Sequence, residues 1–468
     1  MHEDTIFAVA SGAGRAAIAV MRISGSDSAA ILRALTRHLP PSRRASLRRL
    51  RDAAGEELDR ALVLWLPAPA SYTGEDSAEL HLHGGRAVIE GVADALVALG
   101  ARPAEPGEFT RRAFLNGRMD LIEAEAVGDL VEAETSAQRA QALRQLDGAL
   151  GAIYRDWAER LRVLLAQQEA LIDFPDEDLP SETEAVALTE LGALTREIGA
   201  HLADGRRGER LREGLVFAVT GPPNVGKSSL VNALAERDVA IVAATPGTTR
   251  DALEARVVLG GVPVTLVDTA GLRETRDVIE AEGVRRALAR AAVADLVIVV
   301  QEAGSCITSP PPLEGGGGRE GLGTHQSGDL DPSPQPPPAR GGGEEYRPLQ
   351  STPTLRLTNK IDLGGTIPPD AIGVSVRTGA GLDNLRTRLA AEARALTETS
   401  GPPPLTRARH RAALQEAAAC LTRAGEADLP ELRAEDLRLA LRALGRITGQ
   451  IGVEDLLDTI FRHFCIGK

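Results

Sequence analysis

The segment that most constrains the fold of this 468-residue chain is GPPNVGKS at residues 221–228, which fits the pattern GxxxxGK[ST]. It follows a short apolar run at Leu215–Thr220 and precedes a helical stretch that begins near Ser229. In such a unit the glycines let backbone N–H groups surround phosphates, while the lysine, here Lys227, reaches the outer phosphates. The sequence therefore predicts a nucleotide-binding α/β domain around this loop.

Four more short apolar runs follow the loop and are separated by helical stretches. They cover Val262–Val267, Asp295–Val300, Thr354–Thr358 and Ala371–Val376. Strands that alternate with helices are typical of a parallel, doubly wound sheet. We expect this domain to extend over residues 214–399.

Segments next to these strands supply oxygen ligands for Mg²⁺. DTAG at residues 268–271 follows the strand Val262–Val267, so Asp268 can hold the Mg²⁺ shell and Gly271 lets the backbone approach a γ-phosphate. Ser228 offers a hydroxyl to the ion, and Thr249, in the segment GTT at 247–249, offers a second one.

A further segment, NKID at residues 359–362, follows the strand Thr354–Thr358 and selects the base. The Asp362 carboxylate can accept hydrogen bonds from guanine N1–H and from its exocyclic amine, which adenine does not offer. SVR at residues 375–377 can support the base from the next loop. These five elements in this order predict that the nucleotide is GTP and that the chain hydrolyses it.

The residue that positions the attacking water differs from the one used by many GTPases. Many GTPases place a glutamine just after the glycine of DxxG, but here that position is Leu272, which forms no hydrogen bond through its side chain. Glu280, in the stretch that follows, is our candidate for this role, and a solvated side chain is the alternative.

The α/β domain is flanked by segments of different texture. Residues 1–117 predict an α+β domain, and residues 118–213 and 400–468 predict amphipathic helices. We therefore expect a multidomain chain in which the α/β domain is inserted into a discontinuous all-α domain. The predicted N-terminal elements are strands at Thr5–Ala10, Ala16–Ile23, Ala61–Leu66 and Ala78–His83 and a helix at Arg86–Leu99; Pro175 and Pro180 interrupt the helical half that follows.

A segment rich in glycine and proline, at about residues 303–352, interrupts the α/β domain between two strands. It cannot bury enough apolar surface to offset its chain entropy, so we expect disorder there. A long surface loop costs little, so the sheet should form around it.

Composition excludes several classes of protein. No apolar run is long enough to span a membrane, and an acidic N-terminus unlike a signal peptide predicts a cytoplasmic protein. The net charge of −13 argues against bulk coating of nucleic acid, although the arginines between Arg33 and Arg51 form a local cluster, either a solvated face or an RNA contact. Three scattered cysteines predict neither a disulfide framework nor a zinc site.

Lysine is rare here, since only Lys227, Lys360 and Lys468 are lysines among 53 basic residues. The first two lie in nucleotide-binding motifs. Because an ammonium group does what a guanidinium fork cannot, the lysine at the end of the chain is a candidate site residue too.

Motifs along almost the whole chain resemble the MnmE (TrmE) family of tRNA-modification GTPases. Outside the GTPase motifs, the matching segments are MRISG (21–25), SYTGED (71–76), Glu79-Leu80, HGG (83–85), PGEFT (106–110), RAFLNG (112–117) and FCIGK (464–468). The resemblance implies a tetrahydrofolate-binding N-terminal domain, which also dimerises, a discontinuous helical domain and an inserted G domain.

The resemblance also implies a homodimer that forms a heterotetramer with an FAD- and NADH-dependent flavoprotein, MnmG. The two proteins attach an aminomethyl or carboxymethylaminomethyl group to carbon 5 of the tRNA wobble uridine. The one-carbon unit comes from a tetrahydrofolate of the 5,10-methylene or 5-formyl type, and GTP hydrolysis is stimulated by K⁺.

Single residues acquire roles from the same resemblance. The matching K⁺ ligands are Asn224, Ala243, Thr245 and Thr248; the catalytic glutamate is Glu280; and the folate contacts are Arg22, Glu79, Arg118 and Lys468. Together with the motifs above, the expected GTP contacts are Asn224, Val225, Gly226, Lys227, Ser228, Ser229, Ala243, Thr245, Gly247, Thr248, Thr249, Asp268, Thr269, Ala270, Gly271, Asn359, Lys360, Asp362, Ser375, Val376 and Arg377.

Two other functions compete with tRNA modification. A ribosome-assembly GTPase would typically carry an RNA-binding appendage with a GxxG loop, and we find no convincing one. A switch that only recruits partners when loaded with GTP would need no dedicated carboxylate such as Glu280.

Overall fold

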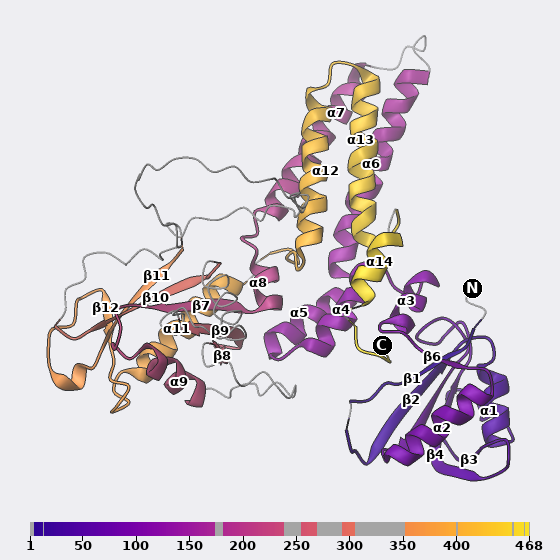
Figure 1. Cartoon of the computed structure of the whole chain (residues 1–468). Helices are drawn as coiled ribbons and strands as arrows, with labels where there is room; N and C mark the ends of the chain where they lie inside the picture. The colour runs from indigo at the N-terminus through magenta and orange to yellow at the C-terminus, as the bar shows by residue number, and fades with distance from the viewer. Residues whose placement is uncertain are drawn as a thin grey trace, which may run out of the picture. The chain divides into compact units, whose positions relative to one another are not determined.

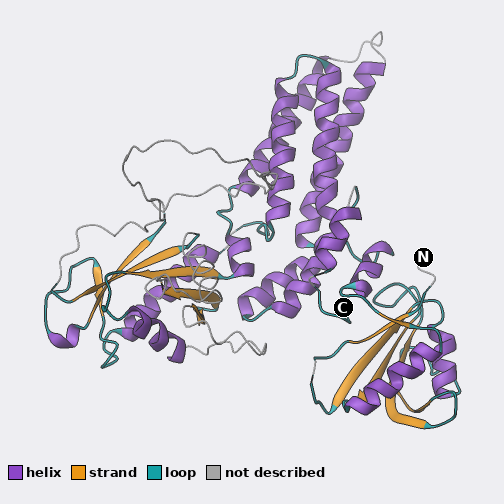
Figure 2. Ribbon diagram, viewed as in Figure 1, coloured by secondary structure: helices purple, strands orange, loops and turns teal. Residues whose placement is uncertain are grey.

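The computed structural model divides the chain into two compact units, Met1–Arg212 with Thr399–Lys468, and Glu213–Glu398 (Figure 1). The residues that the structure describes are 4–12, 14–173, 181–237, 254–268, 293–304, 352–398, 401–451, 454–462 and 464–467. Figure 2 shows two sheets, each accompanied by helices, and a bundle made of helices. Most of the glycine- and proline-rich insertion predicted at about 303–352 lies outside the described residues.

The N-terminal domain is a six-stranded sheet in the order β3-β4-β5-β2-β1-β6, antiparallel except for the parallel pair β1 and β6. Its elements are β1 (Ile6–Val9), β2 (Ile18–Ser24), α1 (Ser28–Thr36), β3 (Ser46–Arg51), β4 (Glu57–Leu66), β5 (Ser77–His83), α2 (Arg86–Ala98), β6 (Arg102–Pro103) and α3 (Glu108–Leu115). The α+β class predicted for this domain is confirmed.

Alternation along β5 separates the two faces of this sheet. Ala78, Leu80 and Leu82 are buried in one cluster with apolar residues of α1 and α2, whereas Glu79 and His81 point to the opposite face. A strand places successive side chains on opposite faces, so one face forms the core with both helices. The opposite face carries the polar residues discussed below.

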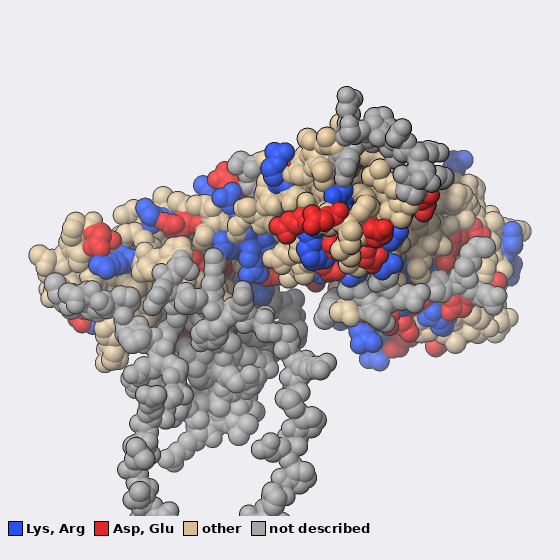
Figure 3. Space-filling view, turned by 90° about the horizontal axis from the view of Figure 1, so that it is seen from above, with Lys and Arg blue, Asp and Glu red and all other residues tan. Residues whose placement is uncertain are grey.

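Strand β3 was not predicted, because its sequence SLRRLR shows a charged rather than an apolar pattern. It pairs with β4 in an antiparallel register at the edge of the sheet. Arg49, Arg51 and Arg60 all pair with the Glu57 carboxylate, which balances part of the arginine cluster. Basic and acidic side chains are also interspersed on the face of the molecule in Figure 3.

The helical domain is built from two segments that lie far apart in sequence. Its helices are α4 (Leu121–Glu132), α5 (Ser136–Leu146), α6 (Ala149–Asp173), α7 (Ser181–Leu202), α8 (Arg207–Glu213), α12 (Ala408–Glu426), α13 (Pro430–Thr448) and α14 (Glu454–Phe461). One apolar core joins Leu161 of α6 and Leu194 of α7 to Leu414 of α12 and Leu444 of α13, and these helices run side by side in Figure 1.

The predicted break at Pro175 and Pro180 falls between the end of α6 and the start of α7, outside the described residues. Among the described helices, none is both long and apolar enough to cross a membrane.

Hydrogen bonds to a buried carboxylate link the two halves of this domain. Glu125 on α4 accepts hydrogen bonds from Arg409 at 2.6 and 2.7 Å and from His410 Nε2 at 3.1 Å. Burial alone would raise the pKa of the Glu125 carboxyl, but Arg409 and Arg407 hold it well below its usual range. Burial, with Arg409 beside the ring, lowers the pKa of His410 to about 4, so that this histidine is neutral.

The inserted domain is a second six-stranded sheet, in the order β12-β11-β10-β7-β9-β8. Its elements are β7 (Leu215–Thr220), α9 (Lys227–Arg237), β8 (Glu254–Leu259), β9 (Val262–Asp268), β10 (Leu296–Glu302), β11 (Thr354–Asn359), η4 (Ile361–Leu363), β12 (Ala371–Gly373) and α11 (Leu382–Thr397). All neighbouring strands are parallel except β8 and β9.

The five strands predicted for this domain are parallel to one another as expected, and the sheet adds at one edge an antiparallel strand, β8, that was not predicted. Gly260 and Gly261, both with positive φ, make a two-residue turn that joins β8 to β9 as an antiparallel hairpin. The last predicted strand was also too long, because β12 ends at Gly373 and the segment that includes Ser375 and Val376 is a loop.

The neutral His410 predicts a pH dependence for the stability of the helical domain. Its pKa is about 4 in the folded chain but ordinary, near ~6.5, after unfolding, so between these values only the unfolded chain gains the proton. Stability should therefore fall as the pH drops from ~6.5 to 4, by on the order of 3 kcal/mol. Urea unfolding followed by Trp157 fluorescence, in a chain carrying Trp65→Phe, measures this.

His410→Gln removes this titrating group and should reduce the pH dependence in that window, whatever it does to the stability at neutral pH. The remaining dependence comes in part from His201, whose pKa burial also lowers. His38→Gln, at an exposed histidine, is the matched control and should leave the profile unchanged. An unaltered slope in the His410 variant would contradict the assignment.

Candidate functional site

The phosphate loop lies between β7 and α9, and two of its glycines are required by the geometry. A Cβ on Gly221 would lie 2.1 Å from the carbonyl oxygen of Val300, and one on Gly226 would lie 2.4 Å from Asn359 Nδ2. Both glycines also have positive φ, where other side chains are strained. The backbone of the loop therefore lies in close contact with the ends of β10 and β11, with no room for a side chain at these two positions.

The ammonium group of Lys227 donates hydrogen bonds to backbone carbonyls of the phosphate loop. Its Nζ donates to the carbonyl oxygens of Gly221 at 2.8 Å and of Pro222 at 2.6 Å, and the residue is buried. Helix α9 begins at Lys227, so its unpaired N–H groups and the ammonium lie at one place. Such a helix start attracts anions, phosphate above all.

A hydroxyl and a carboxylate meet beside the loop. Ser228 Oγ donates to Asp268 Oδ2, and the Asp268 side chain is buried at the end of β9. Alcohol, carboxylate and phosphate oxygens are the ligands that Mg²⁺ prefers, usually together with water. These two residues therefore fit a magnesium ion that bridges to a bound phosphate.

Asn359 connects two of the predicted motifs. Its Nδ2 donates to the carbonyl oxygen of Val225 in the phosphate loop at 2.7 Å, and its Oδ1 accepts from the N–H of Val376 at 3.3 Å. The side chain is buried at the end of β11. Asn359 thus positions the phosphate loop against the loop that carries Ser375 and Val376.

Asp362, the carboxylate predicted to select the base, is held by the same loop. Asp362 accepts from Ser375 Oγ at 2.6 Å and pairs with Arg377 at 2.8 Å. The hydrogen bond from Ser375 and the charge of Arg377 lower the pKa of Asp362, so it is ionised at neutral pH. Lys360, in the left-handed conformation, pairs with Glu302 at 3.2 Å.

The structure thus brings together the motifs at 221–228, 268, 359–362 and 375–377. Asn224 and Ser229 are exposed within or beside the loop. Ten of the predicted residues lie outside the described residues and are not placed: Ala243, Thr245, Gly247, Thr248, Thr249, Thr269, Ala270, Gly271, Glu280 and Lys468.

A second candidate site lies on the N-terminal sheet, on the face opposite α1 and α2. Arg22 on β2 pairs with Glu79 on β5 at 3.0 Å. The Arg22 guanidinium also lies 5.1 Å from the ring centre of Tyr72 and 5.7 Å from that of Phe109. Sequence reasoning missed both rings, although they stand inside the motifs SYTGED and PGEFT.

The other predicted folate residues are less fully placed. Arg118 is exposed, and its side chain lies beside Gly74 of the segment SYTGED. Lys468 is not described, but Gly467 before it packs on β1, where an added Cβ would lie 2.5 Å from the carbonyl oxygen of Val9. Val9 pairs with Met21, next to Arg22, so the C-terminal segment reaches the strand beside this site.

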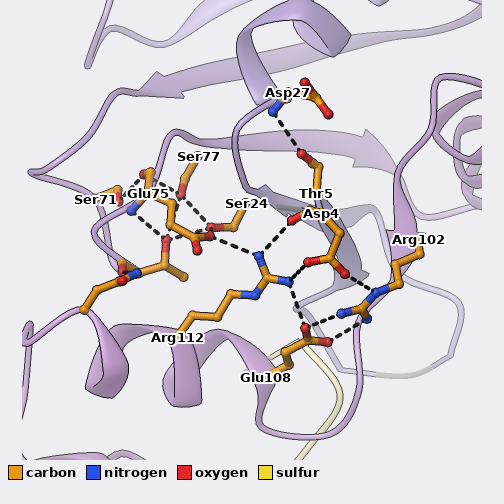
Figure 4. A network of polar contacts seen from close by, with 12 residues as sticks. Asp4, Thr5, Ser24, Asp27, Ser71, Glu75, Ser77, Arg102, Glu108 and Arg112 are labelled. Atoms are coloured by element: carbon orange, nitrogen blue, oxygen red, sulfur yellow. Dashed lines mark hydrogen bonds and ion pairs between the residues drawn. The ribbon is translucent and has the colours of Figure 1, made fainter. Parts of the chain in front are cut away.

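A charged network supports this domain from inside (Figure 4). The buried Arg112 donates to Asp4 and Glu108 at 2.8 and 2.9 Å and pairs with Glu75 at 3.3 Å. Burial would raise the pKa of Glu108, but hydrogen bonds from Arg102 and Arg112 lower it, so the carboxylate stays charged. The network fixes α3, which carries Phe109, to the N-terminal strand.

Comparison with known proteins decides the family. The family model described as the MnmE helical domain matches residues 121–465, and the one described as the GTP-binding protein TrmE N-terminus matches residues 5–118. The chain belongs to the MnmE family. The tRNA modification GTPase MnmE of Gluconacetobacter diazotrophicus is 60% identical, over 99% of this chain and 98% of its own length.

Other MnmE relatives match as fully. That of Granulibacter bethesdensis is 56% identical and that of Rhodospirillum rubrum is 52% identical, each over 100% of both chains. The resemblance predicted from the motifs, the three-part fold and the class of enzyme are thereby confirmed: this is a tRNA modification GTPase. Membership of the MnmE family decides against the ribosome-assembly and simple-switch alternatives.

The double contact of Asn359 predicts a defect in nucleotide binding. Asn359→Ala leaves the Val225 carbonyl and the Val376 N–H without their partner, at a cost of about 1–3 kcal/mol, so GDP should bind roughly ten- to a hundred-fold more weakly. Titration with a fluorescent GDP analogue measures the affinity. Thr354→Ala, at the exposed start of β11, is the control. Unchanged GDP affinity in the Asn359 variant would refute the role of this residue.

Proposed function

We propose that this GTPase works with an FAD-dependent partner of the MnmG type to modify carbon 5 of the tRNA wobble uridine. The added group is aminomethyl or carboxymethylaminomethyl, and the carbon comes from a 5,10-methylene- or 5-formyl-tetrahydrofolate. The observation that carries the proposal is the presence of two separate candidate sites in one chain: the assembled nucleotide motifs around Lys227 and Asn359, and the Arg22–Glu79 cluster beside two aromatic rings. Because the substrate is tRNA, we expect the reaction in the cytoplasm.

In the nucleotide site, each motif receives one task. Lys227 and the start of α9 hold the phosphates, Ser228 and Thr249 bind Mg²⁺, and Asp362 reads the guanine. The buried Asp268 beside Ser228 supports the magnesium assignment. Thr269, Ala270 and Gly271 complete the phosphate contacts, and Ser375, Val376 and Arg377 complete the base contacts.

Hydrolysis needs positive charge near the transferred phosphate and an oriented water. We assign the charge to K⁺, held by Asn224, Ala243, Thr245 and Thr248, and the orientation of the water to Glu280. Asn224 is exposed and in the left-handed conformation within the loop, which leaves its side-chain oxygen available to a cation. A bound K⁺ would supply the charge that an arginine finger supplies in other GTPases.

In the second site, Arg22, Glu79, Arg118 and Lys468 are the proposed contacts of the folate. A carboxylate can accept from the amino and ring N–H groups of a pterin, and cationic side chains can bind the glutamate tail. The rings of Tyr72 and Phe109 beside Arg22 support a flat aromatic ligand there.

We also propose that the chain forms a homodimer through its N-terminal domain and joins the flavoprotein as a heterotetramer. On the sheet face opposite α1 and α2, Leu47 and Leu62 are paired in register and are 66% and 46% exposed. An apolar row of this kind on an uncovered face is typical of an interaction surface. The proposed domains are 1–117, 118–213 with 400–468, and 214–399.

The assignment of Asp362 to base recognition predicts that a substitution there changes the nucleotide preference. In Asp362→Asn the amide offers a donor where guanine also has donors, whereas xanthine has an acceptor there, so preference should shift from GTP towards xanthosine triphosphate. Competition binding against labelled GDP measures it, with Asp370→Asn at an exposed site as control. The same order of preference as in the unaltered chain would exclude Asp362 from base recognition.

The function itself is tested on tRNA. Mass spectrometry of wobble nucleosides from cells that lack this protein should show uridines without the carbon 5 group, and the intact gene should restore it. Arg22→Ala should restore much less, with weaker binding of 5-formyltetrahydrofolate in calorimetry, while Arg196→Ala, at an exposed arginine of α7, should restore it fully. Fully modified wobble uridines in the deletion strain would overturn the proposed function.

A further inference from the structure

The two chain segments that lead into and out of the inserted domain are in direct contact. The outgoing segment runs through α8 to Arg212, and the returning one re-enters the helical domain through Leu405 and Thr406. A Cβ added to Gly208 would lie 2.3 Å from the carbonyl oxygen of Leu405. The N–H of Leu405 donates to Asp204 at 3.2 Å. The segments therefore touch backbone to backbone inside the helical domain.

One face of α5 binds both segments. Gln138, Gln141 and Gln145 are spaced three and four residues apart, which places them on one side of the helix. Their amide nitrogens donate to the carbonyl oxygen of Arg212 at 3.1 Å, to that of Gly208 at 3.1 Å and to Thr406 Oγ1 at 2.8 Å, in that order. We call these three residues the glutamine face.

The polarity of α5 is inverted relative to an ordinary amphipathic helix. Gln141 and Gln145 are 5% and 3% exposed, whereas Leu143 between them is 41% exposed. Burying an amide side chain is unfavourable unless its hydrogen bonds are satisfied, so these two glutamines depend on their bonds to Gly208 and Thr406. What hydrogen bonds add is direction, because they fix both the distance and the angle of the partner.

Ion pairs reinforce the same junction. Asp129 accepts from Arg212 of the outgoing segment at 2.8 Å and from Arg407 of the returning segment at 2.6 Å. Arg411 pairs with Asp204 and Glu209 at 2.6 and 2.7 Å. Acidic residues before the inserted domain thus meet arginines that follow it.

We propose that Gln141 and Gln145 are positioning residues: they hold the two segments that carry the G domain in one arrangement, so that GTP hydrolysis can act on tRNA modification. The proposal rests on the proposed function above. The phosphate loop, the proposed magnesium residues and the base-selecting loop all lie within residues 214–399, whereas the three glutamines belong to α5 of the helical domain. Loss of the glutamine face should therefore spare hydrolysis and reduce the number of tRNAs modified per GTP hydrolysed.

The experiment compares Gln145→Leu and Gln141→Leu with the unaltered chain, in GTPase assays of the purified full-length protein and in wobble-nucleoside analysis of complemented cells. We expect GTPase kcat and KM within about twofold of the unaltered values and at least a fivefold loss of modification. Gln415→Leu, at an exposed position of α12, is the matched control and should preserve both.

A double variant separates positioning from folding. Gln145→Leu with Thr406→Val replaces both partners by apolar groups, so no buried polar group is left unpaired and the thermal midpoint should recover. If modification stays low while the midpoint and the GTPase rate are normal, the positioning role stands. Normal modification in the double variant, or a parallel loss of both activities, would overturn it. Failure of the proposed function would instead appear as full modification in the deletion strain itself, before any gene is returned to it.

Discussion

The ionic contact between Glu125 and the arginines at 407 and 409 is the constraint on which the rest of the structure depends. The carboxylate is buried in the first half of the helical domain, and the compensating charges come from the second half, after the inserted domain. A buried charge without its partner costs several kcal/mol. The half-domain before residue 213 is therefore incomplete until the chain returns, and the two ends of the G domain must converge at one place.

This convergence explains how a domain that carries a nucleotide site can be inserted within another domain. The site is assembled from the carboxyl ends of β7, β9 and β11 and the loops that follow them, where parallel strands bring distant motifs to one edge. Its residues contact one another, as Asn359 does Val225 and Ser228 does Asp268. The Arg22–Glu79 cluster belongs to the other unit, so each candidate site is built from local contacts of its own domain.

The sequence predicted those elements whose local chemistry is distinctive. Glycine spacing located the phosphate loop because only glycine fits at 221 and 226, and apolar runs located the buried parallel strands. Strand β3 escaped because arginines on an edge strand obscure the alternation. Strand β8 was missed although two adjacent glycines between two apolar runs are a sequence signal for a hairpin. Other features depend on tertiary contacts, which a single sequence does not display. These are the link that Asn359 makes between two loops, the rings beside Arg22 and the glutamine face of α5.

Hydrogen exchange of the full-length chain tests most directly whether the two helical halves form one cooperative unit. Amides of α4 (Leu121–Glu132) and α12 (Ala408–Glu426) should open with the same free energy, and Glu125→Gln should lower both values equally. Glu132→Gln, at an exposed position of the same helix, should lower neither. If α12 opened independently, with α4 still protected and insensitive to the loss of the Glu125 charge, the central claim would be contradicted.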